Sequence, residues 1–455
     1  MQNSETIAAI STPPGLGGVG MVRISGPQSL ETARRIFLPA ATWRHFPPTP
    51  GKAVVGRVHP PDRPSEPIDQ AVFLFFQAPR SYTGEDTVEL TTHGSPLVMR
   101  ALLEACLAAG ARLAEAGEFT RRAFLNGRMD LSQAEAVASL IHARTDEARM
   151  VMYNQVAGSM GKALGSLREI LLQVKVVLES ALDFSEDIEE PELVRIPELL
   201  DSGVRMTTAL LTTASRGIAM EAGVSVVIAG TPNVGKSSLL NSLLKEDRAI
   251  VHEAAGTTRD FIEGHMDIKG VPVVIVDTAG VRMDADGAEV EGVLRARRMI
   301  ERADLLLLVV DSSRGLGRGD LSLLQETGAA TRIVVANKLD LPPVAEGLPE
   351  ETVRVSALTG EGLDLLKGAI YETCFGDKTA PQMDGAVVIS VRQAEALRGT
   401  QRSCRRALEA LADDVGLECV AVDVDEALMH LGYLTGTVTT EDVLDEIFSR
   451  FCVGK

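Results

Sequence analysis

Hydrophobic and polar residues alternate in short runs through the first part of the chain, and prolines or glycines separate the runs. The runs GMVRIS, AVVGRV, AVFLFF and DTVELTTHG are rich in β-branched and aromatic residues, which favours strands. The run SPLVMRALLEACLAAGA has helical spacing instead and ends near Gly110, a residue type that commonly follows helices. The pattern predicts an α+β domain over residues 1–120.

Two other regions, residues 121–216 and 381–455, carry apolar residues at helical spacing. Examples are LREILLQVKVVLESAL in the first region and RQAEALRGTQRSCRRALEALADD in the second. Amphipathic helices on either side of an inserted domain can bury their apolar faces against one another in one bundle. We therefore expect a single helical domain that is built from both regions.

Residues 217–380 alternate apolar strands with helices. The runs VSVVIAG, VPVVIVDTAG, DLLLLVVDSS and TRIVVANKLD are mostly apolar, as is typical of parallel strands that are buried on both faces. The sequence thus predicts a multidomain α/β protein. An α+β domain comes first, and a parallel-sheet α/β domain interrupts the α-helical bundle domain that follows.

The composition is that of a globular protein, with 45% hydrophobic and 24% charged residues. The start of the chain lacks the pattern of a signal peptide, and no run of about 18 apolar residues predicts a membrane span. The five cysteines are scattered without a CxxC pair, which favours a reducing compartment and argues against structural zinc. We expect a cytoplasmic protein without a membrane partner.

The formal net charge of −18 predicts weak nonspecific attraction to nucleic acid. A nucleic-acid partner would therefore need a local basic patch. The run FTRRAFLNGR, which contains Arg121, Arg122 and Arg128, is a candidate for such a patch. A solvated helix face is the alternative interpretation of this run.

A candidate phosphate-binding loop follows the strand VSVVIAG. The segment GTPNVGKSS matches GxxxxGK[ST] from Gly230 to Ser237 and leads directly into a helical pattern. Glycines allow backbone amides to face phosphate oxygens, and the helix N-terminus adds favourable partial charge. We expect Lys236 to reach the outer phosphates and the Ser237 hydroxyl to bind Mg²⁺.

Two further motifs end later strands of the same domain. Asp277 and Gly280 have the DxxG spacing of a carboxylate that holds the metal's water shell and an amide that meets the γ-phosphate. In NKLD, Asp340 can accept two hydrogen bonds from guanine, a pairing that adenine cannot offer. The predicted nucleotide-binding residues are Asn233, Val234, Gly235, Lys236, Ser237, Ser238, Asp277, Thr278, Ala279, Gly280, Asn337, Lys338, Asp340, Ser356 and Ala357.

These elements, in this order at the ends of successive strands, resemble the translation-factor-like GTPases. In many GTPases a glutamine that orients water follows DxxG, but here the residue is Val281, whose apolar side chain cannot do so. The resemblance implies that the glutamate of a VE motif in the second switch takes this role. That glutamate corresponds to Glu291, with Glu289 as the alternative, although both could be solvated residues of a loop.

Asn233 and the loop GTTRD resemble a potassium-dependent branch of the same GTPases. In that branch a monovalent cation occupies the position of an arginine finger, and the GTPase domains dimerise around it. The resemblance implies K⁺ ligands at Asn233 and Thr257 and a Mg²⁺ ligand at Thr258, with Thr257 as the alternative for Mg²⁺.

The flanking regions resemble the MnmE (TrmE) family of tRNA-modification GTPases over essentially the whole chain. The motifs are ISTPPGLGGVGMVRISGP, SYTGEDTVELTTHG, GARLAEAGEFTRRAFLNGRMDLSQAEAV and FCVGK, in the family's order. The resemblance implies a homodimer through the N-terminal domains and a complex, heterotetrameric or larger, with the FAD-dependent partner MnmG (GidA). Together they would add an aminomethyl or carboxymethylaminomethyl group to carbon 5 of the wobble uridine of certain tRNAs.

The same resemblance implies that the N-terminal domain binds a one-carbon folate, 5,10-methylenetetrahydrofolate or 5-formyltetrahydrofolate. Charged and amide groups suit a pterin and a glutamate tail. The candidate contacts are Arg23, Glu85, Arg121 and Asn126. Surface salt bridges are the alternative role for Glu85 and Arg121.

Cys452 lies in the terminal FCVGK, where Gly454 and Lys455 do not fit a prenylation motif. Nearby Arg450 and Lys455 would favour the thiolate, and the resemblance places this tail toward the folate pocket. We therefore expect a functional thiol rather than a core cysteine. A GTP-dependent RNA-binding switch, such as a ribosome-assembly factor, is the alternative function, and it predicts a basic RNA-binding appendage and no folate pocket.

Overall fold

The computed structural model describes residues 5–40, 48–183, 193–246, 263–277, 298–314, 316–326, 331–342, 344, 347–376 and 385–455. The chain divides into two compact units. The first comprises Met1–Ala138, Leu164–Arg168 and Asp425–Lys455, and the second comprises Ser139–Ala163 and Glu169–Val424. Among the described helices, none has both the length and the apolar character that a membrane span requires.

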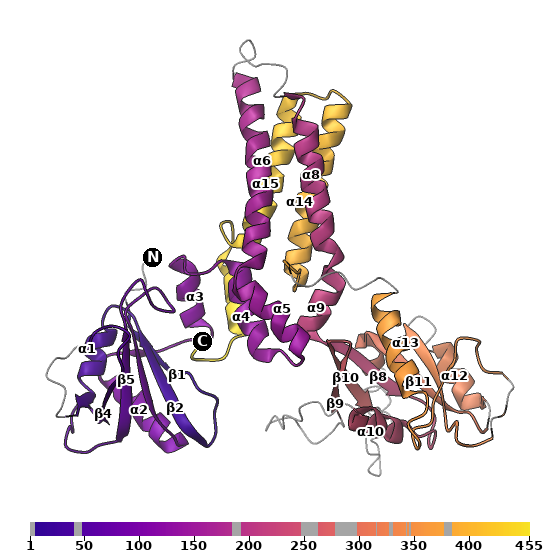
Figure 1. Ribbon diagram of the computed structural model, residues 1–455, viewed down its shortest axis with the longest axis horizontal. Helices are drawn as coiled ribbons and strands as arrows, with labels where there is room; N and C mark the ends of the chain where they lie inside the picture. Colours follow the sequence, from indigo (N-terminus) through magenta and orange to yellow (C-terminus); the bar gives the residue numbers. More distant parts are fainter. Residues whose placement is uncertain are drawn as a thin grey trace. The chain divides into compact units, whose positions relative to one another are not determined.

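A seven-stranded sheet in the order β3-β4-β5-β6-β2-β1-β7 forms the base of the first unit (Figure 1). Neighbouring strands are antiparallel, except that β1 and β7 are parallel. Buried and exposed side chains alternate along β4, as expected of a strand with one face on the core. The strands are β1 (Ile7–Ile10), β2 (Gly17–Ser25), β3 (Phe37–Pro39), β4 (Val54–Val58), β5 (Asp69–Phe76), β6 (Thr87–Gly94) and β7 (Arg112–Leu113).

Two helices, α1 (Ser29–Arg34) and α2 (Pro96–Ala108), accompany this sheet, and α2 contacts β1, β2 and β6. The fully buried Phe73 and Leu90 of the sheet share one core with Leu102 of α2. Each such side chain contributes about 1.5–3 kcal/mol by leaving water. The α+β fold expected for the N-terminal region is confirmed.

Sequence-distant segments pack beside this sheet within the first unit. Helix α3 (Glu118–Leu125) contacts α16 (Glu441–Ser449), and Phe448 of α16 packs on Leu131 at the start of α4 (Leu131–His142). Beyond α16, the last residues of the chain continue onto the edge of the N-terminal domain.

The second unit contains helices from two distant regions of the chain. Helix α8 packs along α14, although the parallel sheet lies between them in sequence (Figure 1). Leu200 of α8 and Leu397 of α14 are fully buried. This confirms the expectation of a helical domain interrupted by an inserted fold. Outside the inserted fold, this unit includes the helices α5 (Asp146–Val156), α8 (Ile196–Thr212), α9 (Ala214–Ala222) and α14 (Val391–Ala412), and parts of α4, α6 (Ser159–Asp183) and α15 (Leu417–Thr435).

The inserted fold is a six-stranded sheet in the order β13-β12-β11-β8-β10-β9 (Figure 1). All neighbours are parallel except the edge strand β9, which is antiparallel to β10. Every residue of β11 is buried, which explains its continuous apolar run. The strands are β8 (Val224–Ala229), β9 (Glu263–Ile268), β10 (Val271–Asp277), β11 (Leu305–Asp311), β12 (Arg332–Asn337) and β13 (Val353–Arg354), with helices α10 (Lys236–Glu246), α12 (Arg318–Glu326) and α13 (Leu363–Phe375).

This topology brings the predicted nucleotide motifs to one edge of the sheet. The loop that contains GxxxxGKS follows β8, Asp277 ends β10, and Asn337 ends β12. The carboxyl ends of parallel strands lie at the same edge, where open α/β sheets usually bind their ligands. The boundaries 1–120, 121–216, 217–380 and 381–455 stay a prediction.

Candidate functional site

The loop after β8 wraps around the start of α10. Lys236, which is only 9% exposed, donates from Nζ to the carbonyl oxygens of Gly230 and Thr231, at 2.9 and 3.0 Å. Burial lowers the pKa of Lys236, and the nearby Asp277 carboxylate opposes that shift. Gly235 has a φ of +94°, and a Cβ there would lie 2.3 Å from Nδ2 of Asn337, so this position requires glycine.

Two oxygen ligands suited to Mg²⁺ lie side by side at this loop. The hydroxyl of Ser237 donates to Oδ2 of Asp277 at 2.6 Å, and Asp277 is fully buried at the end of β10. A hydroxyl and a carboxylate are hard donors of the kind that Mg²⁺ prefers, and Mg²⁺ usually takes only one or two protein ligands beside substrate phosphates. The residues present therefore fit a magnesium ion that accompanies a nucleotide.

Asn337 connects the phosphate loop to the loop that is expected to meet the base. Its Nδ2 donates to the carbonyl oxygen of Val234 at 2.9 Å, and its Oδ1 accepts from the backbone N–H of Ala357 at 2.9 Å. The hydroxyl of Ser356 donates to Oδ1 of Asp340 at 2.5 Å. The structure thus brings the residues predicted for the phosphates and for guanine together in one site.

Asp311 belongs to this site but escaped the sequence analysis. Its Oδ2 accepts from Nζ of Lys338 at 2.6 Å, and the same ammonium donates to the carbonyl oxygen of Asn233 at 2.9 Å. Burial raises the pKa of Asp311, but hydrogen bonds from Lys338 and Ser313 outweigh that effect and leave the pKa lowered. The available signal was its place at the end of a buried parallel strand, between β12, which ends in Asn337, and β8, which leads into the phosphate loop.

Several predicted residues lie outside the described part of the chain. They are Thr257, Thr258, Thr278, Ala279, Gly280, Glu289 and Glu291. Asn233 is described, and it is exposed in the phosphate loop with a φ of +67°.

A second group of predicted residues lies on the N-terminal sheet. Arg23 on β2 pairs with Glu89, its neighbour in register on β6, at 2.9 Å. The Arg23 guanidinium lies 5.2 Å from the ring centre of Tyr82 and 5.7 Å from that of Phe119. Arg23 is therefore held by one carboxylate and two aromatic rings.

The C-terminal tail reaches this Arg23 cluster. Val453 forms a β-bridge with Ala116, and the hydroxyl of Ser11 donates to the carbonyl oxygen of Gly454 at 3.0 Å. Burial lowers the pKa of Lys455, the Arg23 guanidinium adds to the effect, and Glu89 opposes it. The exposed thiol of Cys452 is thus carried by a docked segment beside the residues predicted to bind folate.

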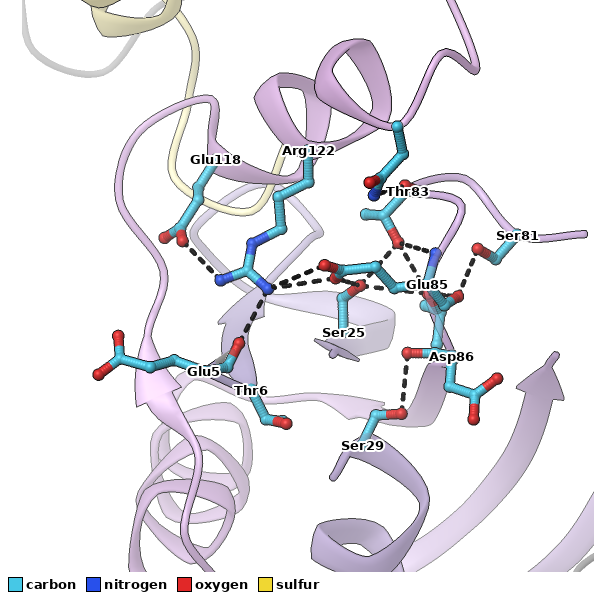
Figure 2. Close-up of polar contacts among 12 residues, drawn as sticks. Glu5, Thr6, Ser25, Ser29, Ser81, Thr83, Glu85, Asp86, Glu118 and Arg122 are labelled. Carbon is cyan, nitrogen blue, oxygen red and sulfur yellow. Dashed lines mark hydrogen bonds and ion pairs between the residues drawn. The ribbon is translucent and has the colours of Figure 1, made fainter. Parts of the chain in front are cut away.

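Glu85 lies between Ser25 and Arg122 (Figure 2). Its Oε2 accepts from the Ser25 hydroxyl at 2.9 Å and from Nη1 of Arg122 at 3.1 Å. Ser25 and Arg23 are two residues apart on β2, so their side chains share one face of the sheet. Asn126 donates to the carbonyl oxygen of Thr83 at 2.7 Å, on the loop that carries Glu85.

The paired arginines of α3 have different environments. Arg121 donates to Asp445 and Glu441 of α16, at 2.9 and 2.5 Å, and so ties α3 to α16 rather than to the Arg23 cluster. Arg122 is 2% exposed, and it donates to Glu118 and to the carbonyl oxygen of Glu5 as well as to Glu85. A buried Arg122 cannot belong to a surface patch for tRNA or to a solvated helix face, so both interpretations are wrong for this residue.

Known proteins resemble this chain over nearly its whole length. A family model described as the MnmE helical domain matches residues 131–452, and one described as the GTP-binding protein TrmE N-terminus matches residues 6–128. The tRNA modification GTPase MnmE of Aquifex aeolicus is 43% identical and covers 99% of this chain and 100% of its own. The protein of the same name from Symbiobacterium thermophilum is 43% identical and covers 99% of each chain.

Among solved structures, the G domain of the FeoB iron transporter of T. maritima is 28% identical over 33% of this chain and 98% of its own. Its TM-score is 0.26, which is too low to add to the sequence comparisons.

Proposed function

The chain belongs to the MnmE family of tRNA modification GTPases, and we propose that it hydrolyses GTP to drive the modification of wobble uridine in tRNA together with MnmG (GidA). The observation that carries this proposal is the similarity of the full chain to MnmE proteins. Among the described residues, groups suited to phosphates and to guanine also lie at one sheet edge, which supports it. The product would carry an aminomethyl or carboxymethylaminomethyl group on carbon 5.

GTP would bind with its phosphates in the loop from Gly230 to Ser237 and its base at Asp340. Lys236 would exchange its two backbone partners for phosphate oxygens, which are stronger acceptors because they are charged. Asn337 fixes the spacing between phosphate and base because it bonds to both loops. Mg²⁺, when bound by Ser237 and Thr258 with Asp277 holding its water shell, would neutralise charge on the phosphates.

We propose K⁺ ligands at Asn233 and Thr257. Asn233 suits this role because its side chain is exposed on the phosphate loop while Lys338 fixes its carbonyl group. Glu291, or Glu289 in its place, would orient the attacking water that Val281 cannot orient.

The N-terminal site would bind a one-carbon tetrahydrofolate through Arg23, Glu85 and Asn126. Arg23 offers a cation between aromatic rings, Glu85 offers a carboxylate to ring N–H groups, and Asn126 offers an amide. Arg121 enters this proposal as the residue that holds α16, and through it the segment that carries Cys452. Cys452 would act as a functional thiol in a cytoplasmic homodimer.

Mass spectrometry of tRNA from cells that lack this protein tests the function. We expect the C5 modification of wobble uridines to disappear and to return with the full-length gene. Unchanged wobble uridines would refute the proposal and favour a GTP-dependent RNA-binding switch. Calorimetric titration with 5-formyltetrahydrofolate, with GDP as the folding control, tests the N-terminal site separately, because a protein that binds GDP but not folate lacks that site.

A further inference from the structure

A tight turn at Lys269 and Gly270 joins β9 to β10. Both residues have left-handed backbone conformations, with φ of +51° and +82°. Oδ1 of Asp267 accepts from the backbone N–H of Gly270 at 2.6 Å and closes the turn. The carbonyl oxygens of Lys269 and Gly270 both accept hydrogen bonds from residues outside the hairpin.

Two residues of the helical region donate to these carbonyl groups, and a third residue pairs with one of the donors. The hydroxyl of Thr145 donates to the carbonyl oxygen of Gly270 at 2.7 Å, in a buried contact. Arg216 of α9 donates to the carbonyl oxygen of Lys269 at 3.2 Å and to the carboxylate of Glu147 at 2.8 Å. We call Thr145, Glu147 and Arg216 the turn socket.

The turn socket fits the turn closely. A Cβ on Gly270 would lie 1.9 Å from Oε2 of Glu147 and 2.8 Å from its Cβ, so the turn backbone lies directly against Glu147. Arg216 is only 9% exposed, and its Nε has no hydrogen-bond partner among the described residues. Burying a donor without a partner destabilises the folded state, so the buried position of Arg216 depends on its hydrogen bonds to Glu147 and to the Lys269 carbonyl.

The strands on either side of the turn lead to the nucleotide site. β10 runs from the turn to Asp277, whose carboxylate meets Ser237. β9 starts at Glu263, shortly after the predicted cation ligands Thr257 and Thr258 in sequence. In the described sheet β9 pairs only with β10, so the two strands form one hairpin.

The residues of the turn socket lie on or beside two helices, α5 and α9, and α9 leads toward the phosphate loop. Thr145 caps α5 by accepting from the backbone N–H of Ala148 at 3.1 Å. Helix α9, which carries Arg216, is followed by Gly223 and then by β8, the strand that precedes the phosphate loop. A displacement of the hairpin along its axis must therefore either break the contacts of the turn socket or move α5 and α9.

We propose that the turn socket couples the nucleotide state of the GTP site to the helical region, so that Thr145, Glu147 and Arg216 are positioning residues for tRNA modification. None of the three is among the residues predicted to bind nucleotide, metal or folate. This inference rests on the proposed function, because it assumes that GTP hydrolysis and tRNA modification are linked. The turn socket supplies the contacts between the two parts of the chain, and the two states that an allosteric connection requires are what the hydrogen-exchange comparison measures.

Hydrogen exchange on the unmodified full-length protein gives the first test. Amides of α5 should exchange at rates that differ by about 5-fold or more between the complexes with GDP and with a nonhydrolysable GTP analogue and Mg²⁺. Thr145→Val removes both the donor to Gly270 and the cap of α5, so the two nucleotide complexes are compared within the same variant. The difference between them should disappear in Thr145→Val and return in Thr145→Ser. Equal exchange of α5 in both complexes of the unmodified protein would overturn the proposal without any variant.

Activity gives the second test. Arg216→Met should lower the modified fraction of wobble uridines about 5-fold or more in complemented cells, while GTP turnover changes by no more than about 2-fold. Arg149→Ala is the matched control, because Arg149 lies on α5 but forms only an exposed pair with Asp146. Full modification by Arg216→Met, or a parallel loss of turnover and modification, would contradict the proposal. Loss of modification in the gene deletion but not in Arg216→Met would leave the proposed function intact and reject only the coupling.

Discussion

The hydroxyl of Ser356 donates to Oδ1 of Asp340 at 2.5 Å, so the carboxylate predicted to recognise guanine is oriented by the loop that follows β13. Asp340→Asn exchanges one acceptor oxygen for a donor amide, which faces the donor N–H groups of guanine. We expect GDP affinity to fall about 10-fold to 100-fold and XDP affinity to rise. Competition binding with the two nucleotides measures both, and a retained preference for GDP would mean that Asp340 does not contact the base.

Potassium should accelerate GTP turnover by about 10-fold or more over sodium, because a cation in the position of an arginine finger stabilises transition-state charge. Asn233→Gly should bring the two rates together. Glycine is the right replacement because Asn233 has a φ of +67°, where alanine would add backbone strain. GDP affinity measured in both salts distinguishes an effect of the cation on turnover from an effect on nucleotide binding. Equal turnover rates in the two salts for the unmodified protein would contradict the proposed potassium site.

Acid should destabilise the N-terminal domain through Glu118. Burial raises the pKa of Glu118, but hydrogen bonds from Arg112, from the Glu115 backbone and from Arg122 outweigh it, so the pKa lies below the ordinary value. A lowered folded-state pKa contributes stability that is complete above the unfolded-state pKa of about 4.3 and is lost as the pH falls through the folded-state value.

Glu118→Gln removes that contribution and leaves the buried Arg122 short of a carboxylate. Because Arg122 keeps its contacts with Glu85 and the Glu5 carbonyl, we expect a loss of about 1–3 kcal/mol near neutral pH and a weaker dependence on acid. Thermal unfolding from neutral pH down to about pH 3 measures both effects. If the stability of the variant falls with acid as steeply as that of the unmodified protein, a group other than Glu118 causes the acid sensitivity.

Arg23 and Arg121 should differ in folate binding. Arg23→Gln removes a cation held between Tyr82 and Phe119, and we expect affinity for 5-formyltetrahydrofolate to fall about 10-fold or more. Arg121→Ala breaks only the pairs with Glu441 and Asp445, so affinity should change by less than about 5-fold. Titration calorimetry distinguishes the two, and a larger loss for Arg121 would reverse their proposed roles.

Gly454→Ala should displace the C-terminal tail. A Cβ there would lie 2.1 Å from the carbonyl oxygen of Ile10, and Gly454 has a φ of +101°. Misplacement of a reacting group by about 1 Å can cost about 100-fold in rate, so tRNA modification should fall by about 10-fold or more while GTP turnover stays unchanged. Val453→Ala is the control, because Val453 bridges Ala116 through its backbone. If the two variants modify tRNA to the same extent, the position of the C-terminal tail does not control modification.

The parts of the structure that local pattern controls were predictable from sequence. Buried parallel strands have continuous apolar runs, and the residues that end β8, β10 and β12 must meet at one edge, so Lys236, Asp277 and Asn337 were found together. Asp311 ends β11 in the same way, but it carries no motif and was missed.

Contacts between residues that are far apart in the sequence were harder to predict. Arg121 and Arg122 are adjacent and chemically identical, and only the rotation of α3 decides which one is buried. The spacing of Glu118 and Arg122 by four residues was the one local sign of their pairing. The contact of Arg121 with α16 and that of Thr145 with Gly270 join residues far apart in the chain, so no local pattern could reveal them.

The packing of α8 against α14 has a consequence for the order in which the chain folds. During synthesis α8 emerges well before α14, and the parallel sheet is made in between. Domains generally fold as they are made, so the sheet can fold while the apolar face of α8, including Leu200, still lacks its partner. At this stage the nascent chain exposes the apolar face of α8 next to a folded domain. We expect the protein to depend most on chaperones before α14 has been synthesised.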